Sequence, residues 1–415
     1  MKRFIAWAFV AGLGVASLDA AEMRIWTSRK GGTLEATLGG VDGVNVTLIG
    51  KDAKQVKLKA EDLSIADREH LVEFGGADAS IITGGKPGLV EKDVRIDTST
   101  FKKLEGKLMF PEGPSEGFDM FETPNFLIAT AGDVRPQAIA ETAERMWYGM
   151  AFVHMDFRQN WGDKKMLILL IEDRAAYTAM GEWYRTYLKN TGDTDGALRV
   201  KSTWEQSGSM QLPVPDELQE KRKLLPSGLL FNVKEASQFR KPLSPFMVHT
   251  IAGRLLGKQM GNVSSFGAEG YFAVVTGHAY FKEISLAGKS ETSLLAVSGT
   301  GQDEISSKRG FEDGTSWARS LRPLVRSGKV PVKLDAMLKW KSEELTPERL
   351  VLIYSFACYM ESDSKRLAAF AKMIRRIEAS QQIPAPEEFA KIFGFETVEA
   401  LEADWTTFIK EGDFK

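Results

Sequence analysis

The chain is organised around a stretch that reads Pro245-Phe-Met-Val-His-Thr-Ile-Ala-Gly-Arg-Leu-Leu256, then a loop, then Ser265-Phe-Gly-Ala-Glu-Gly-Tyr-Phe-Ala-Val-Val275. Both halves read as short helices, and we expect them to face each other. His249 lies near the start of the first helix and Glu269 opens the second. The space between these two helices is therefore the first place to look for functional side chains.

Zinc peptidases of the H-E-x-x-H type place two histidine ligands one helical turn apart, with the intervening glutamate as the general base. A glutamate on the next helix is the third ligand. Here His249 occupies the first position, but Thr250 stands at the base position and Gly253 at the second histidine. Glu269 follows at a suitable distance for the third ligand. The stretch therefore predicts a peptidase-like scaffold that has lost its metal and its chemistry.

Three further features match this scaffold: the segment Glu172-Asp-Arg-Ala-Ala-Tyr177 after a strand, the Glu269-Gly270 pair, and a helical tail that closes on Trp405. With them, residues 120 to 412 resemble the gluzincin, peptidase MA-like domains of bacterial secreted proteins. That family prefers a small residue where Phe272 stands. The resemblance implies a zincin-like α+β fold. It does not imply activity, because the two lost positions are the ones that catalysis needs.

We expect no metal or other cofactor at the helix pair. A rebuilt zinc site of His249, Glu269 and His278 is the alternative. His278 follows Glu269 by nine residues, so on one helix the two side chains diverge unless the helix breaks at Gly277. His154 continues the apolar stripe of an earlier helix and is interpreted as a core or helix-end residue rather than a ligand.

The N-terminus has the composition of a secretion signal. A positive start, Lys2-Arg3, precedes an apolar run over Phe4–Ser17 and the small residues Ala20-Ala21. Residues 1–21 are therefore predicted to be a signal peptide that is removed on export. No later stretch is long and apolar enough to span a membrane. We expect a periplasmic or secreted protein.

Residues 22–74 alternate in short strands separated by glycine-rich turns, a pattern typical of a small β barrel. The opening Arg24-x-Trp-Thr27 and the ending Leu63-Ser-x-x-Asp67 resemble SLA1 homology domain 1, an SH3-like fold, over residues 23–74. The resemblance implies a protein-binding accessory module. Because its hairpins are local and its alternation complete, the segment is expected to fold alone. Trp26 is either a platform for a ligand or an aromatic residue of the core or rim.

The remaining chain divides into three parts. Glycine and proline punctuate residues 75–120, which are predicted to be a linker. Residues 121–300 alternate strands with helices and form the degenerate peptidase-like α+β domain. Residues 301–415 form a helical C-terminal subdomain, in which Arg375 and Arg376 are interpreted as a solvated face.

Within the α+β domain, Phe126–Thr130 is a predicted strand, and Lys165–Ile171 is a continuous apolar strand expected to be buried on both faces. Residues 185–240 are polar and rich in turns, and Pro213-Val-Pro215 has the character of an insertion. Gly228–Val233 is the predicted edge strand. In active relatives such a strand holds a peptide by strand addition.

Composition excludes some functions. Of 415 residues, 43% are hydrophobic and 27% charged, which is ordinary for globular domains. The net charge of -2 gives no electrostatic reason to expect binding to nucleic acid or to an anionic membrane.

Three hypotheses follow. The first is a non-catalytic, peptidase-like protein of the cell envelope that binds peptide or protein through its SH3-like module and degenerate cleft. The second is an active zinc metallohydrolase with a rebuilt site, and the third is a structural envelope protein. Fold resemblance supports the first two only by analogy.

Overall fold

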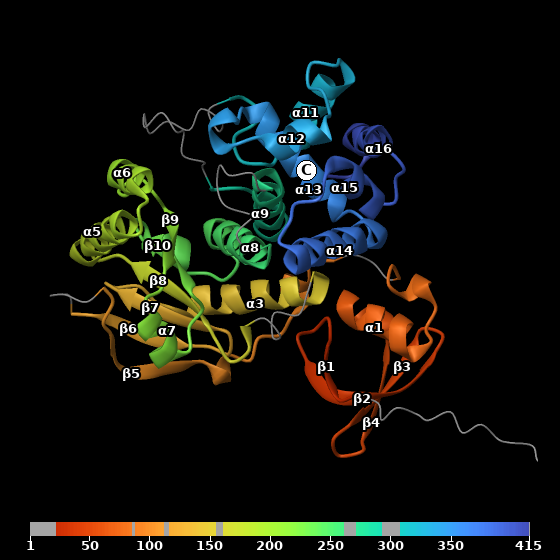
Figure 1. Ribbon diagram of the computed structural model, residues 1–415, viewed down its shortest axis with the longest axis horizontal. Coiled ribbons are helices and arrows are strands. Elements are labelled where there is room, and N and C mark those ends of the chain that lie inside the picture. Colours follow the sequence, from red (N-terminus) through yellow and green to blue (C-terminus); the bar gives the residue numbers. More distant parts are fainter. Residues whose placement is uncertain are drawn as a thin grey trace, which may run out of the picture.

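The computed structural model describes residues 22–84, 88–111, 116–154, 161–260, 271–292 and 308–414. The expected signal peptide and Glu269 lie outside the described residues. The described chain has an N-terminal antiparallel sheet, then a region in which helices cover a mixed sheet, and then a helical C-terminal part (Figure 1). At this level the multidomain architecture agrees with the expected fold class. Among the described residues, no helix is long and apolar enough to cross a membrane.

The N-terminal module is a four-stranded sheet in sequence order, with each neighbouring pair antiparallel. Its strands are β1 (Arg24–Thr27), β2 (Thr33–Asp42), β3 (Asn45–Gly50) and β4 (Gln55–Lys59). The helix α1 (Ile65–Gly75) follows and covers the sheet (Figure 1). Gly43 adopts a φ of 55° in the turn between β2 and β3, a conformation that favours glycine. The local hairpins expected from the sequence are therefore present.

Asp67 joins the two ends of this module. Its Oδ1 accepts a hydrogen bond from Arg24 Nη2 at 2.8 Å, and its Oδ2 accepts one from the backbone N–H of Thr27 at 2.8 Å. The hydroxyl of Ser64 also donates to Oδ2 and accepts from the backbone N–H of Asp67, which caps α1. The two sequence motifs that define the module thus meet at one buried carboxylate.

The second sheet has six strands in the order β5-β6-β7-β8-β10-β9. The three central strands are parallel, and the pairings outside them are antiparallel. The strands are β5 (Lys102–Leu108), β6 (Phe118–Glu122), β7 (Phe126–Ala131), β8 (Met166–Ile171), β9 (Ser209–Pro213) and β10 (Ser227–Asn232).

The predicted linker over residues 75–120 differs from the structure. Its second half forms β5 and most of β6, which pair with each other and extend the second sheet beyond β7. Its first half includes the short helix α2 (Val90–Asp93), which packs on the body of the protein. The sequence pattern does not indicate a strand at β5, because this strand reads Lys-Lys-Leu-Glu-Gly-Lys-Leu and is largely exposed. An exposed edge strand lacks the apolar alternation that identifies a half-buried one.

The edge strand at the other side of the sheet is also not the predicted one. Gly228–Val233 corresponds to β10, which lies between β8 and β9, whereas the edge is β9. β9 ends at Pro213, which is the first residue of the segment interpreted as an insertion. Proline is tolerated at sheet edges because one side of an edge strand needs no hydrogen bonds.

Helices cover both faces of the second sheet. The strand β8 sends alternate side chains into two cores, and all six of its residues are buried, as expected. One core contains residues of α3 (Gln137–Val153) and α8 (Pro245–Gln259). The other contains residues of α5 (Arg174–Asn190) and α6 (Thr194–Thr203). The small helix α7 (Asp216–Arg222) lies between β9 and β10 in sequence.

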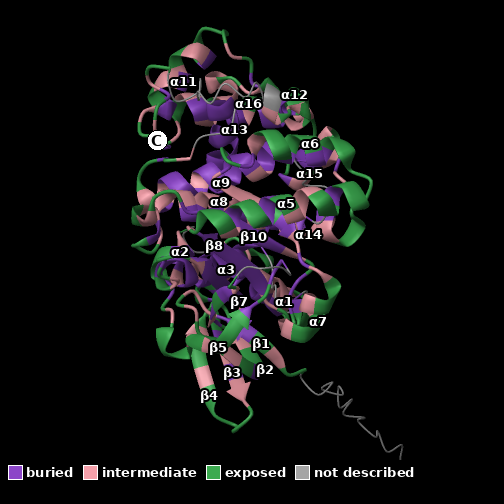
Figure 2. Ribbon diagram, turned by 90° about the vertical axis from the view of Figure 1, so that its left-hand side faces the viewer, coloured by how far each residue is buried: buried purple, intermediate pink, exposed green. Residues whose placement is uncertain are grey.

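The C-terminal part continues the first of these cores, and Figure 2 shows its central helices as largely buried. Its helices are α9 (Phe272–Ala287), α11 (Trp317–Arg326), α12 (Leu334–Lys339), α13 (Pro347–Met360), α14 (Ser364–Ser380), α15 (Pro386–Ile392) and α16 (Val398–Glu411). Short 3-10 helices are Ala60–Asp62, Ala79–Ile81, Thr98–Thr100, Ala236–Phe239 and Ser342–Glu344. The side chains of Thr346 and Thr397 cap α13 and α16.

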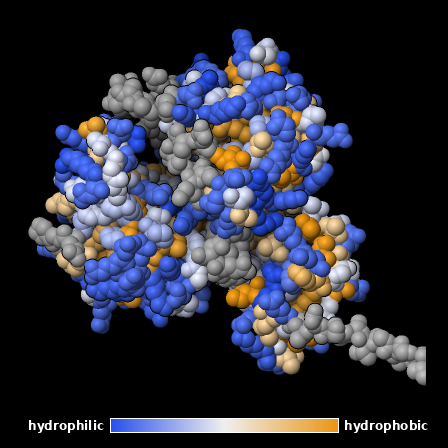
Figure 3. Space-filling view, in the orientation of Figure 1, coloured by the Kyte–Doolittle hydropathy of each residue, from blue (hydrophilic) through white to orange (hydrophobic). Residues whose placement is uncertain are grey.

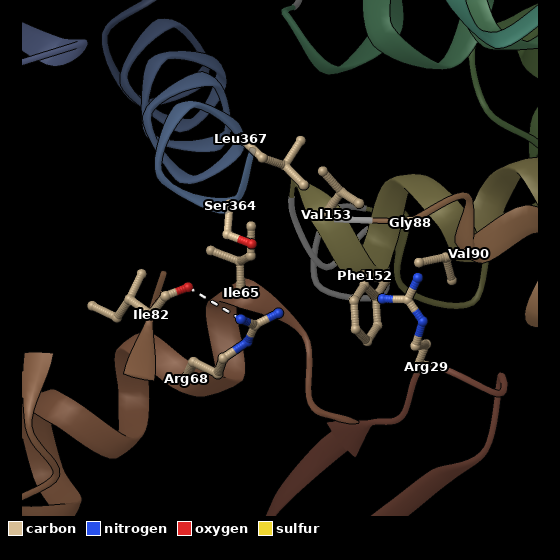
Figure 4. A pocket seen from close by; sticks show the side chains of 10 residues that line it. All are labelled: Arg29, Ile65, Arg68, Ile82, Gly88, Val90, Phe152, Val153, Ser364 and Leu367. Carbon is tan, nitrogen blue, oxygen red and sulfur yellow. Dashed lines mark hydrogen bonds between the residues drawn. The ribbon is translucent and has the colours of Figure 1, made fainter. Parts of the chain in front are cut away.

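The N-terminal module is docked against the body near the ends of α3 and α14. Ile65 of α1 shares an apolar cluster with Val90, Phe152, Val153 and Leu367. The cavity at this junction is drawn in Figure 4, and its volume is about 10 Å³. That volume holds about one water molecule, so the two parts meet closely.

Arg375 of α14 reinforces this junction and is therefore not a solvated residue. Its Nη2 lies 2.6 Å from Glu69 Oε1 of α1, and its Nη1 donates to the backbone oxygen of His154 at 2.9 Å. Burial lowers the pKa of Arg375, although the carboxylate of Glu69 opposes this effect. One side chain thus connects α14 to α1 and to the end of α3.

We expect residues 22–84 to fold alone with a cooperative thermal transition and a β-type circular dichroism spectrum. The module has its own core, and that core includes Ile81, which is 6% exposed. A fragment that stops at residue 74 lacks Ile81 and should be less stable by about 2–5 kcal/mol, the usual cost of truncating a buried isoleucine. Equal melting temperatures for the two fragments would contradict the assignment of Ile81 to this core.

Candidate functional site

The helices α8 and α9 pack against each other as the sequence predicts, and α9 also packs against α13. Glycines permit the close approach. A β carbon at Gly277 would lie 2.5 Å from the carbonyl oxygen of Ile353 in α13. The helix α9 continues through Gly277 without a break, so this glycine serves helix packing.

His249 points from α8 towards α9 and meets a glutamate that the sequence analysis did not select. Its Nδ1 lies 2.9 Å from Glu283 Oε2, and its ring packs edge-on against Tyr280. The side chain of His249 is 13% exposed and that of Glu283 is fully buried. His249 therefore has a carboxylate partner from the C-terminal half of α9.

Both carboxylate oxygens of Glu283 accept hydrogen bonds. Its Oε2 accepts from the hydroxyl of Ser290, and its Oε1 accepts from the backbone N–H groups of Glu291 and Thr292. The hydroxyl of Thr292 also donates to Oε1. The carboxylate thus fixes the chain that follows α9, and this role is structural.

The residues at positions 250 and 253 do not fit a catalytic zinc. Thr250 Oγ1 lies 3.5 Å from Ser209 Oγ and carries no carboxylate to act as a base. A β carbon at Gly253 would lie 3.4 Å from Ala279 Cβ and 3.7 Å from Val275 Cγ1. An alanine fits there, but an imidazole directed between the helices would require α9 to move.

The edge strand β9 runs beside α8. Arg254 of α8 donates to Gln211 Oε1 of β9 and to Ser227 Oγ of β10. Burial lowers the pKa of Arg254 to about 10. Together with the Ser209–Thr250 contact, these bonds show that α8 packs beside the edge of the sheet.

The hydrogen-bond register shows which backbone groups of β9 face outward. The N–H of Asn232 donates to Gly208 oxygen, and the N–H of Val214 donates to Pro226 oxygen. Because inward and outward residues alternate along an antiparallel strand, the backbone groups of Ser209, Gln211 and Pro213 point away from β10. β9 is the last strand in the sheet order, so the described residues leave this edge without a neighbouring strand.

A second group of polar side chains lies in the core between α2, α3, α9 and α13, and it is not among the sites predicted from the sequence. Its members are Glu91, His154, His278, Lys282 and Glu361, which we call the buried ionic cluster. Lys282 Nζ lies 3.1 Å from Glu91 Oε1 and 3.1 Å from Glu361 Oε2. His278 Nδ1 lies 2.7 Å from Glu361 Oε1. Each of the five residues is at most 8% exposed.

Electrostatics in this cluster favour charged Lys282 and Glu361. Burial alone raises the pKa of Glu361, but the charge of Lys282 and the hydrogen bond from His278 outweigh it and hold this pKa at about 2. Burial alone lowers the pKa of Lys282, but the nearby carboxylates raise it above its usual value. Burial lowers the pKa of His154 well below its usual range, so its ring is neutral at pH 7.

His154, His278 and Glu361 form a group that can hold a metal ion. One ligand atom from each lies within 4.8 Å of the other two. His154 is the residue at the end of α3, in agreement with its interpretation as a helix-end residue. The set differs from the rebuilt site of His249, Glu269 and His278, because His278 meets Glu361 whereas His249 meets Glu283. The sequence signal for this group was the occurrence of Lys282 and Glu361 within or directly after apolar helices.

Trp26 belongs to the core of the N-terminal module. It is 1% exposed, and its Nε1 donates to the backbone oxygen of Ala36. His70, half-buried, packs between Trp26 and Phe74. The module does have a groove of about 620 Å³ across β2, β3 and β4, and Trp26 is not among its lining residues. A ligand of this module would therefore not stack on Trp26.

Comparison with protein-family models, with curated proteins and with solved structures finds no match for the chain. Function is therefore inferred from the geometry above.

Proposed function

We propose that this chain is an exported, non-catalytic protein with a peptidase-like scaffold, and that it binds an extended peptide segment of another protein. The observation that carries this proposal is the outward edge of β9 beside α8. The peptide would add to the sheet as a further strand next to β9. The SH3-like module would act as an accessory binding domain.

The residues of α8 support binding in place of catalysis. A zinc hydrolase needs three protein ligands and a base near a metal-bound water. In this chain His249 is the only candidate ligand on α8, and its ring contacts the carboxylate of Glu283. That carboxylate also accepts hydrogen bonds from Ser290 and from the chain that follows. We therefore propose that no catalytic zinc is held between α8 and α9.

The edge of β9 supports strand addition. Ser209 and Gln211 each present a backbone N–H and C=O outward, whereas Pro213 presents only its C=O. The side chains of Ser209 and Gln211 reach towards α8, so side chains of an added strand would lie over the same helix. Backbone pairing would provide affinity, and contacts with α8 would provide selectivity.

The N-terminal module supports a second point of contact. Four exposed large hydrophobic residues belong to it: Met23, Ile25, Val44 and Phe74. Figure 3 shows hydrophobic side chains over this part of a mostly hydrophilic face. The groove of the module is lined by Asp42, Lys57, Lys59 and Asp62 among others, so it offers both charge signs to a ligand. These features suit a protein partner.

We expect Gln211→Pro to weaken binding of labelled, reduced casein, an unstructured protein, by about tenfold. The substitution removes an outward N–H that the sheet itself does not use. Gln211→Ala is the matched control, because it removes the same side chain and keeps the N–H. Pro213 already occupies an outward position in β9, so this edge tolerates proline and the variant should melt close to the Gln211→Ala control, which also lacks the bond from Arg254.

Affinity can be measured by fluorescence anisotropy with the full mature chain. Equal affinities for Gln211→Pro and Gln211→Ala would reject strand addition at β9, and absence of casein binding by the parent would reject peptide binding altogether. Hydrolysis of casein that disappears in His249→Ala would instead establish the active zinc hydrolase.

A further inference from the structure

We infer that His154, His278 and Glu361 form a structural binding site for a divalent transition-metal ion of the zinc class. The site joins the C-terminal end of α3, the middle of α9 and the residue that follows α13. It is separate from the α8–β9 neighbourhood and does not depend on the proposed function.

The donor set and its spacing carry this inference. Two imidazoles and one carboxylate are ligands that zinc commonly takes in proteins. Zinc–nitrogen bonds of about 2.0–2.1 Å put the ligand atoms of a tetrahedral ion roughly 3.3 Å apart. The three ligand atoms here already lie within 4.8 Å of one another, so small rotations of side chains close the remaining gap.

Unpaired imidazole nitrogens provide the second, independent observation. His154 is 1% exposed and His278 is fully buried. Among the described residues, three imidazole nitrogens have no hydrogen-bond partner: Nδ1 and Nε2 of His154, and Nε2 of His278. Buried polar atoms are normally satisfied, because each unsatisfied one costs about 1–3 kcal/mol. A metal ion would use the lone pair on His154 and reduce this cost.

Charged groups of both signs surround the site. Glu91 and Glu361 provide two carboxylates beside Lys282, and Arg375 donates to the backbone oxygen of His154. Lys282 and Arg375 disfavour a metal, and the two carboxylates offset them. Glu361 also presents a separate oxygen to each neighbour, Oε1 to His278 and Oε2 to Lys282. The same carboxylate can therefore serve the ion and keep Lys282.

Burial assigns the metal a structural role. A catalytic zinc keeps one coordination position open to water, whereas structural sites are closed. All three ligand residues are at most 8% exposed, and the ring of Phe370 packs against both histidines. An ion held there would connect three helices of the C-terminal core and stabilise the folded state.

The test is metal analysis of the full mature chain, purified without a histidine tag and dialysed against zinc and then against buffer. We expect about one zinc per chain in the parent. His154→Ala and His278→Ala should lose it, whereas the matched control His249→Ala should retain it. Zinc should raise the melting temperature of the parent, and a chelator should reverse that rise.

Cobalt(II) provides a readout that needs no variant. Metal-free parent protein that binds one cobalt ion with the strong visible absorption of a tetrahedral site would support the inference even if the histidine variants fail to fold. Trace metal in the parent, with no change in melting temperature on adding zinc, would overturn it. Zinc that is lost in His249→Ala but retained in His154→Ala would also overturn it, and would place the ion at α8.

Discussion

Replacing Lys282 by methionine is expected to lower the free energy of unfolding by about 3–5 kcal/mol. Lys282 is 2% exposed and is the only ammonium within 3.1 Å of both Glu91 and Glu361 among the described residues. Its removal leaves two buried carboxylates without this cation. The cost of such an uncompensated charge exceeds the net contribution of the ion pair itself. Urea denaturation with a chelator present measures the change without a contribution from bound metal.

Two further variants test the explanation. Glu91→Gln combined with Lys282→Met should recover part of the lost free energy of unfolding, because one of the two buried carboxylates left without Lys282 is then neutral. Lys289→Ala removes an exposed lysine that pairs with Glu291 and should have little effect. If Lys282→Met is no more destabilising than Lys289→Ala, the cluster is not a determinant of stability.

Gly277→Ala is expected to destabilise the protein by about 1–3 kcal/mol or more. The added β carbon would lie 2.5 Å from the carbonyl oxygen of Ile353 and 3.3 Å from Ala357 Cβ. Because one of these atoms belongs to the backbone, α9 and α13 must separate. Alanine has a higher helix propensity than glycine by about 1 kcal/mol, which offsets only part of this cost.

Gly253→Ala is the matched control in the neighbouring helix and should act in the opposite direction. Its β carbon would make ordinary contacts of 3.4 Å and 3.7 Å with α9. The gain in helix propensity should then raise stability by up to about 1 kcal/mol. Thermal and urea unfolding of both variants measure these two opposite changes in stability. A neutral Gly277→Ala would show that α9 and α13 are not held as closely as described.

Local sequence patterns were sufficient for much of the fold. The alternation and turns of residues 22–74 specified four antiparallel strands, since hairpin contacts are close in sequence. The apolar run around Met166–Ile171 specified a strand buried on both faces. Capping residues such as Thr346 and Thr397 located helix starts, because a cap acts within one turn.

The two edge strands of the second sheet were not predicted from the sequence. β5 is largely polar and exposed, β9 is only five residues long and ends in proline, and each pairs with one neighbouring strand. Their strand state comes from backbone hydrogen bonds to that neighbour, which a sequence pattern does not display. For this reason part of the predicted linker belongs to the second sheet, and the polar, turn-rich residues 185–240 contain its edge strand.

By itself, the sequence determined what the α8 helix lacks: with Thr250 and Gly253 it has neither a carboxylate next to His249 nor a second histidine one turn later, and no folding supplies them. Only the tertiary structure decided which groups the remaining side chains meet. It paired His249 with Glu283, 34 residues away, and His278 with Glu361, 83 residues away. It also buried Lys282 between Glu91 and Glu361. Such partners are chosen by helix packing at Gly253 and Gly277 and by the need to pair every buried charge, and both are properties of the assembled core.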